Sequence, residues 1–139
     1  MTEQPFDIEK AAGIIIKNRK AVLTRSFGKN VFVPPGGKLE GSESQVAALI
    51  RELKEELGID VIEDDLEFIN NYFAEAAGGS GKSLKMGVWM VGKYAGDMRP
   101  QNEIDEVAEV GSELPSGMKV GSIFEHDVIP YLKRNDLID

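Results

Sequence analysis

Three glutamates stand close together in a stretch that is otherwise rich in leucine: Glu52, Glu55 and Glu56. If the stretch is helical, residues three and four apart are neighbours on its surface, so the three carboxylates lie on one side of the helix. Grouped carboxylate oxygens suit Mg²⁺ and Mn²⁺, which bind through a few carboxylates together with water and a substrate phosphate. The spacing therefore predicts a divalent-cation site suited to phosphate chemistry.

The alternative is an ordinary acidic helix surface that faces solvent. Three features disfavour it. Glu52 and Glu56 are four residues apart and repel each other by a few tenths of a kcal/mol, and the negative cluster lies in the C-terminal half of the helix, where the helix dipole also disfavours anions. Lys54 lies on the other flank and does not neutralise the group. A bound cation would turn this repulsion into binding energy.

The helix that carries these glutamates has start and stop signals of its own. Ser42 is the expected N-cap, with Gln45 completing a capping box, and Gly58 is the expected residue just after the C-terminus. At roughly 100° per residue, one apolar stripe is expected to face the core: Val46, Leu49, Ile50, Leu53 and Leu57. The three glutamates fall in another arc, which we expect to face away from the core.

The rest of the chain alternates between strands, turns and a second helix. Expected strands are Ala12–Lys17, Ala21–Arg25, Val31–Val33, Leu66–Phe73, Leu84–Tyr94 and Val107–Val110. Loops are expected around Gly36, Gly37 and Gly41 and over Gly78–Lys82. A last helix should begin near Ser122 with Glu125 in a capping box, and Pro130 should kink it or start a new turn. This order predicts an α/β or α+β fold with a mixed sheet.

Composition narrows the classes of function. The 139 residues fit a single domain, 1–139, and the chain has no cysteine, which suits a reducing cytoplasm. The first ten residues lack the apolar core of a signal peptide, and no apolar run is long enough to span a membrane. The net charge of −8 disfavours nucleic acid as a partner. A small phosphorylated substrate would also be repelled unless a cation lies between it and the acids.

The sequence around the glutamates resembles the Nudix box of MutT-like Nudix hydrolases. Gly37 and Glu43 stand at the spacing of that pattern, followed by the continuous run from Arg51 to Ile59, and every fixed position is filled. The resemblance implies a Nudix fold, an α/β/α sandwich around a mixed sheet. It also implies a metal-dependent pyrophosphohydrolase that cleaves a phosphoanhydride bond in a nucleoside diphosphate linked to another group. One departure is Pro34, which stands where many members have a large apolar residue before Pro-Gly-Gly.

The same resemblance suggests roles for individual residues. Glu55, Glu56 and the backbone carbonyl of Gly36 would coordinate Mg²⁺, with Mn²⁺ as the alternative. Glu52 would be either a further metal ligand or the general base that takes a proton from the attacking water. Arg51 would hold a carboxylate in place through charge-assisted hydrogen bonds, and Glu43 is expected to be structural.

Besides the fixed positions of the box, three residues are candidates for the site, each with a surface role as the alternative. Some members of the family take their base from elsewhere in the chain, and Glu103 lies in a loop-like stretch, 100–106, where such a base is expected. Arg25 and Lys38 could reach the substrate phosphates. From the resemblance we expect a small nucleoside diphosphate derivative as partner, no nucleic acid and no membrane, and we leave a homodimer open.

Two other functions remain as alternatives. One is a Nudix-fold module that binds a nucleotide without cutting it, although such a module would be expected to lose acids of the box, and none is lost. The other is a P-loop phosphotransferase, because Ala76–Ser83 resembles a loose P-loop. A P-loop must open a helix, whereas the residues after Ser83 predict a strand.

Overall fold

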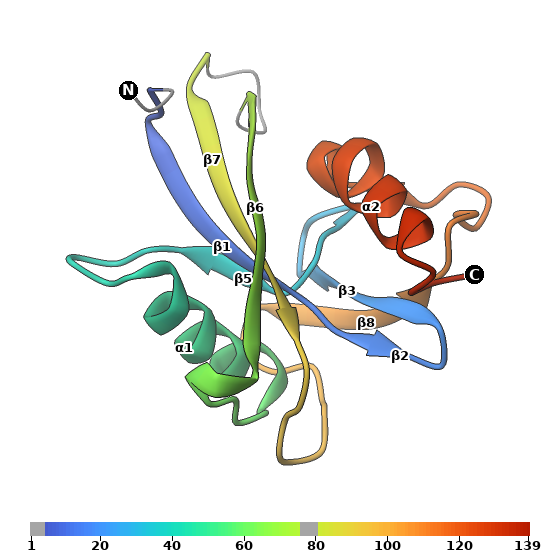
Figure 1. The fold of residues 1–139 in the computed structure, drawn as a ribbon, viewed down its shortest axis with the longest axis horizontal. Coiled ribbons are helices and arrows are strands. Elements are labelled where there is room, and N and C mark those ends of the chain that lie inside the picture. Colours follow the sequence, from blue (N-terminus) through green and yellow to red (C-terminus); the bar gives the residue numbers. More distant parts are fainter. Residues whose placement is uncertain (1–4, 76–80) are drawn as a thin grey trace.

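The computed structural model describes residues 5–75 and 81–139 (Figure 1). The strands are β1 (Ile8–Ile14), β2 (Ile16–Lys17), β3 (Lys20–Ser26), β4 (Val31–Phe32), β5 (Gly36–Lys38), β6 (Leu66–Glu75), β7 (Ser83–Val91), β8 (Ile104–Val110) and β9 (Lys119–Val120). The helices are α1 (Gln45–Leu57), the short 3₁₀ turn η1 (Glu63–Asp65), the π-helical turn η2 (Phe124–Val128) and α2 (Ile129–Arg134).

The strands form a mixed arrangement, as expected. The largest sheet has the order β5-β1-β7-β6, in which β1 and β7 are parallel and the other neighbours antiparallel. A second, antiparallel sheet has the order β2-β3-β8, and β4 and β9 form a parallel pair. Only Ile15 separates β1 from β2, so the chain passes from the first sheet to the second at this residue.

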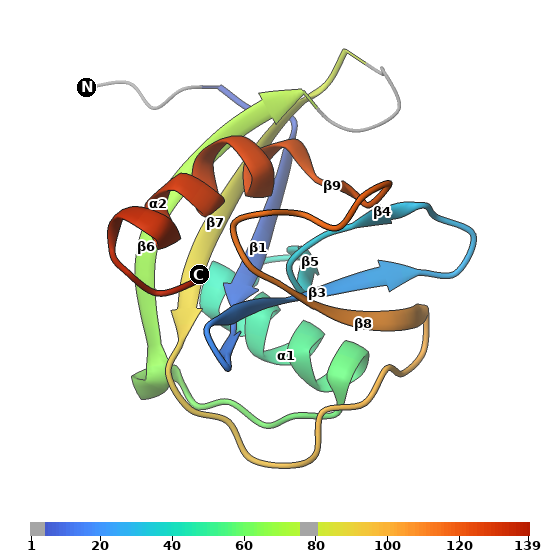
Figure 2. The same ribbon diagram turned by 90° about the vertical axis from the view of Figure 1, so that its right-hand side faces the viewer.

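The two main helices lie on opposite sides of the strands (Figures 1 and 2). Along β3, Ala21 and Leu23 face the core that contains the C-terminal helix, whereas Val22 faces the core that contains α1, because successive side chains of a strand point to opposite faces. Each face of the strands is therefore covered by a helix. This is the α/β/α layering that the family resemblance implies.

Helix α1 begins two residues later than expected. Its N-cap is Ser44, whose hydroxyl accepts a hydrogen bond from the backbone N–H of Ala47 at 3.1 Å. The prediction of Ser42 was wrong because residues 40–43 form a turn, in which the N–H of Glu43 donates to the carbonyl of Glu40. The C-terminus is as predicted, since Gly58 adopts a left-handed conformation and its N–H donates to the carbonyl of Lys54.

Gln45 does not complete a capping box. Its side-chain amide donates to Glu9 and Asn71, and its oxygen accepts from the indole N–H of Trp89 at 2.9 Å. The start of α1 is therefore tied to strands β1, β6 and β7 of the largest sheet. In the predicted apolar stripe, the three leucines are fully buried, whereas Val46 and Ile50 are only partly buried.

The C-terminal helical segment shows what Pro130 does to it. The N–H of Ile129 donates to the carbonyl of Phe124, a bond that spans five residues and widens the helix into a π-turn just before the proline. α2 then starts anew, with Pro130 in its first turn. Within residues 5–75 and 81–139, no hydrogen bond joins the side chain of Ser122 to Glu125, because the Glu125 N–H donates to the carbonyl of Gly121 instead.

Several expected boundaries shift. Strand pairing begins at Ile8 rather than Ala12, and Gly36 and Gly37 lie in strand β5 rather than in a loop. Residues 76–80, which hold most of the predicted Gly78–Lys82 loop and of the P-loop-like run, lie outside the described residues. Strand β7 follows from Ser83 and pairs antiparallel with β6, so no helix opens there and the P-loop alternative fails. No helix among the described residues is both long and apolar enough to cross a membrane.

Candidate active site

Two glycines let strand β5 approach both β1 and helix α1. Gly36 pairs with Ala12 and has φ of +147°, and a Cβ added to it would lie 2.8 Å from the Cα of Ala12. A Cβ on Gly37 would lie 2.8 Å from the carboxyl carbon of Glu52. A side chain at Gly36 would therefore push the strand away from the backbone of β1, whereas at Gly37 it would displace the side chain of Glu52, a glutamate of the box.

Glu52 and Glu56 are buried, contrary to the expectation that they face away from the core. Their relative exposures are 9% and 5%. The expectation failed because helix periodicity identifies only the apolar stripe that packs against the main core. It does not show that another element can cover a second side of the helix. Here β5 packs against the acidic side of α1, and the N–H of Gly36 donates to Oε1 of Glu56 at 3.1 Å. Glu55 alone of the three remains exposed.

The segment before β8 caps the C-terminal end of α1. The side-chain amide of Asn102 donates to the carbonyl of Glu55 at 2.7 Å, and the N–H groups of Gln101 and Arg99 donate to the carbonyls of Glu56 and Leu57. These bonds satisfy carbonyls that a helix C-terminus leaves without a partner. They also fix the segment that leads to Glu103.

Glu103 is brought to the two buried glutamates. Carboxylate oxygens of Glu52, Glu56 and Glu103 all lie within 4.8 Å of one another. The backbone of Glu103 is fixed as well, because its carbonyl accepts from the N–H of Phe27 at 2.8 Å. The structure therefore gathers the predicted outside acid with two acids of the box, while Glu55 is not a member of this group.

Arg51 ties the box together. Its Nε and Nη2 donate to the two oxygens of Glu43 at 2.8 and 2.9 Å, and Nη1 donates to Oε1 of Glu52 at 2.6 Å. A longer bond of 3.4 Å runs from Nη1 to Glu55. The guanidinium beside Glu43, together with the N–H of Glu40, lowers the pKa of Glu43 to about 2, and the pKa of Arg51 is raised.

Burying the charged carboxylates of Glu52 and Glu56 side by side costs free energy unless a cation neutralises them. Burial raises the pKa of Glu56 to about 8, against the hydrogen bond from Gly36, and the charges of Glu52 and Glu103 raise it further. Burial also raises the pKa of Glu52, although Arg51 opposes the shift. An all-oxygen set of carboxylates that repel one another fits a hard divalent cation, which would neutralise them.

A pocket of about 450 Å³ lies on the other face of β1 and β5. Ile8, Leu84 and Met86 contribute to its apolar floor, and the start of the C-terminal helix contributes Ile123 and Phe124. Three cationic side chains also line it: Lys10, Lys29 and Lys38. Lys38 was expected from the sequence. Lys10 was missed, although a lysine in a strand whose next residues are all apolar is a signal that could have identified it.

Arg25 is placed differently from Lys38. Its Nη2 lies 2.7 Å from Asp105 and 3.2 Å from Glu106, so the guanidinium pairs with acids of the neighbouring strand β8. It also stacks over the ring of Phe32 at 5.4 Å. Arg25 is not among the residues that line the 450 Å³ pocket.

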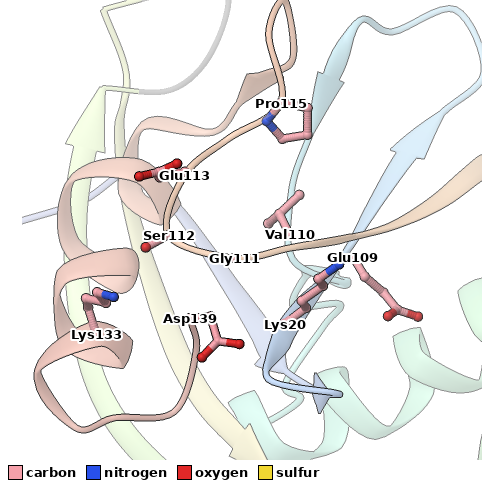
Figure 3. A pocket seen from close by; sticks show the side chains of 9 residues that line it. All are labelled: Lys20, Glu109, Val110, Gly111, Ser112, Glu113, Pro115, Lys133 and Asp139. Atoms are coloured by element: carbon pink, nitrogen blue, oxygen red, sulfur yellow. The ribbon is translucent and has the colours of Figure 1, made fainter.

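A second hollow, of about 380 Å³, lies near the C-terminus (Figure 3). Lys20, Lys133, Glu113 and Asp139 are among its lining residues, so it carries charges of both signs. It contains none of the glutamates of α1, and Asp139 is already paired with Arg19 at 2.6 Å. This hollow is separate from the candidate active site.

Comparisons with known proteins agree with the family resemblance of the sequence. A family model of the NUDIX domain matches residues 7–116. The CTP pyrophosphohydrolase of Escherichia coli (strain K12) is 33% identical over 96 residues, which cover 66% of this chain and 67% of that protein. The 8-oxo-dGTP diphosphatase of Buchnera aphidicola subsp. Acyrthosiphon pisum (strain APS) is 29% identical over 127 residues, covering 89% and 95%.

Among solved structures, the MutT protein from Methanosarcina mazei Go1 superposes with a TM-score of 0.74. The match covers 98% of this chain and 99% of that chain at 22% identity, so it supports the fold alone. The family model covers most of the chain and includes β5, α1 and Glu103. These matches show that the chain belongs to the Nudix family and is a Nudix pyrophosphohydrolase.

Proposed function

We propose that this hydrolase cleaves a phosphoanhydride bond of a nucleoside diphosphate derivative, with water attacking one phosphorus while the bond from that phosphorus to the bridging oxygen breaks. The observation that carries the proposal is the group of Glu52, Glu56 and Glu103, whose oxygens lie within 4.8 Å of one another. A pocket with an apolar floor and three lysines lies across strands β1 and β5 from it. Such a pocket suits a nucleoside at one end and phosphates at the other.

We propose Mg²⁺ as the cation, with Mn²⁺ as a substitute. Glu52, Glu56 and Glu103 would hold it, and the family resemblance adds Glu55 and the carbonyl of Gly36. When bound, the ion would neutralise phosphate charge and orient water. Support for a cation comes from the cost of burying Glu52 and Glu56 side by side, which the raised pKa of Glu56 reflects.

Residues of the chain supply the proton transfer, the positioning of Glu52 and the binding of phosphate. Glu52 is buried and its carboxylate is fixed by Arg51, and we assign to it the role of taking the proton of the attacking water. Arg51 and Glu43 act as positioning residues, because their hydrogen bonds hold Glu52 without contacting the substrate. Lys38 is the expected basic residue that lines the pocket, and we propose that it binds phosphate. The ion pairs of Arg25 with Asp105 and Glu106 favour a role in holding β3 to β8 instead.

The experiment is a substrate panel assayed with Mg²⁺, reading out phosphate released after a coupling phosphatase. CTP and 8-oxo-dGTP come first, because two relatives carry these substrates in their names; ADP-ribose and a dinucleoside polyphosphate follow. Glu56→Gln should remove most of the turnover on the best substrate. The matched control is Glu67→Gln on the exposed surface of β6, which should leave the turnover unchanged.

A non-catalytic nucleotide-binding module remains the second candidate. It predicts that a panel member binds with Mg²⁺ but is recovered intact after long incubation with the folded protein. That result would overturn hydrolysis as the function while leaving the nucleotide site in place.

A further inference from the structure

Lys10 and Lys38 form a like-charge pair directly across two antiparallel strands. Lys10 of β1 is the register partner of Lys38 of β5, and both line the 450 Å³ pocket. Like charges opposite each other in a sheet are destabilising. Lys10 is also half-buried, so its stem lies against the pocket floor while Lys38 and Lys29 are exposed at the rim.

Three lysines and one acid, Glu75, line this pocket. Within residues 5–75 and 81–139, no carboxylate lies within 4.0 Å of the Nζ of Lys10, Lys29 or Lys38. Burial lowers the pKa of Lys10, and the charges of Lys38 and Lys29 lower it further, whereas the charge of Glu56 opposes the shift. With three lysines against the single acid Glu75, the pocket carries a local excess of positive charge in a protein whose net charge is −8.

The position of Lys10 along β1 indicates a role for its positive charge. Ala12 pairs with Gly36, whose N–H contacts Glu56, and Lys10 lies two residues earlier, about 6.6 Å away at roughly 3.3 Å per strand residue. Ile8, two residues earlier again, belongs to the apolar floor. Along β1, Lys10 therefore lies between Ala12, which pairs with the glycine that contacts Glu56, and Ile8 of the apolar floor.

We propose that Lys10, Lys38 and Lys29 form a cationic rim that holds the polyphosphate chain of a nucleoside triphosphate, and that Lys10 determines the preference for triphosphates over two-phosphate diesters such as ADP-ribose. This inference rests on the proposed nucleotide site. The triphosphate has more negative charge than a two-phosphate diester, so it gains more from three clustered cations. An apolar floor without the rim would hold the nucleosides of both classes equally.

The decisive variant is Lys10→Met, which keeps the length of the stem and removes the charge. It should relieve the repulsion from Lys38, so the midpoint of urea unfolding should rise. It should also weaken binding of inorganic tripolyphosphate to the metal-free protein in EDTA by about tenfold or more, measured by calorimetry at low salt. If Lys10 has only a structural role, Lys10→Met should lower stability and leave the affinity for tripolyphosphate unchanged.

Selectivity supplies the second readout. The ratio of kcat/KM for CTP to kcat/KM for ADP-ribose should fall by about tenfold in Lys10→Met and Lys38→Gln, while the exposed control Lys93→Gln keeps both the ratio and the tripolyphosphate affinity. An unchanged ratio, or a wild-type preference for ADP-ribose, would overturn the inference even though hydrolysis is intact. Failure of hydrolysis across the panel, with tripolyphosphate binding still dependent on Lys10, would overturn the proposed function and retain the anion site.

Discussion

Nη1 of Arg51 donates to Oε1 of Glu52 at 2.6 Å, while the same guanidinium holds both oxygens of Glu43. One arginine thus connects the loop before α1 to a buried carboxylate in the middle of the helix. The fork of a guanidinium can donate in several directions at once, whereas the ammonium of a lysine is a single point. The orientation of Glu52 therefore depends on a residue that does not itself belong to the carboxylate group.

The first prediction follows for Arg51→Lys. The lysine should keep the charge but lose the bidentate contact with Glu43, lowering kcat by about tenfold or more and the free energy of unfolding by about 1–3 kcal/mol. In a double-mutant cycle with Glu43→Gln, the two effects should be strongly non-additive. Additive losses would mean that Glu43 and Arg51 act independently.

The second prediction concerns the stability of the metal-free protein. Glu56 has a folded-state pKa of about 8, above its ordinary value of 4.5. Between these pH values the unfolded chain has lost a proton that the folded protein keeps, so stability must fall as pH rises, by at most about 1.4 kcal/mol per pH unit for one proton. Urea unfolding in EDTA from pH 4.5 to 8 measures this slope.

Glu56→Gln should reduce that slope and raise stability at pH 8, because it removes a buried charge, whereas Glu67→Gln should leave the slope unchanged. Added Mg²⁺ should stabilise the wild-type protein more at pH 8 than at pH 5, because a carboxylate ligand must lose its proton to bind. A wild-type protein whose stability rises steadily over this range would contradict the assignment.

The third prediction contrasts two neighbouring glycines. Gly36→Ala would place a Cβ against the backbone of Ala11 and Ala12 with φ of +147°, so it should impair folding. Gly37→Ala would instead meet the side chain of Glu52, which can move. It should therefore lower kcat by about tenfold or more with a smaller loss of unfolding free energy. Equal stability losses in the two variants would be inconsistent with this arrangement.

The sequence was sufficient for features that depend on local pattern. The 3.6-residue period located Leu49, Leu53 and Leu57, Gly58 marked the helix end, and the spacing of the box identified the glutamates. Ser44 was missed because Ser42 has the same capping chemistry and only the turn at 40–43 distinguishes them.

Features that depend on distant segments could not be predicted in this way. Glu52 and Glu56 are buried because β5 and the stretch 99–103 cover a side of α1 that periodicity assigns to solvent. The pairing of Lys10 with Lys38 depends on strand register, which no single strand specifies. Glu103 lies in a turn just before β8, as the loop-like stretch predicted, but the sequence did not show that hydrogen bonds from Arg99, Gln101 and Asn102 to α1 anchor the residues before it.

The last prediction identifies the general base. Glu52→Gln should lower kcat by about 10²- to 10⁴-fold, and Glu103→Gln should have a smaller effect. Glu52 is buried and fixed by Arg51 before substrate arrives, and burial raises its pKa, although Arg51 opposes the shift. Glu103 has a fixed backbone but an exposed side chain, which loses more conformational freedom on reaching the water.

The measurement is kcat across pH for both variants at saturating Mg²⁺, together with the Mg²⁺ concentration needed for half-maximal turnover. Loss of the acidic limb of the pH profile identifies the base, whereas a raised Mg²⁺ requirement identifies a metal ligand. If Glu103→Gln is the more damaged and also loses the acidic limb, Glu103 is the base. Glu52 would then be a metal ligand whose bond to Arg51 fixes the geometry of the cation rather than that of the proton transfer.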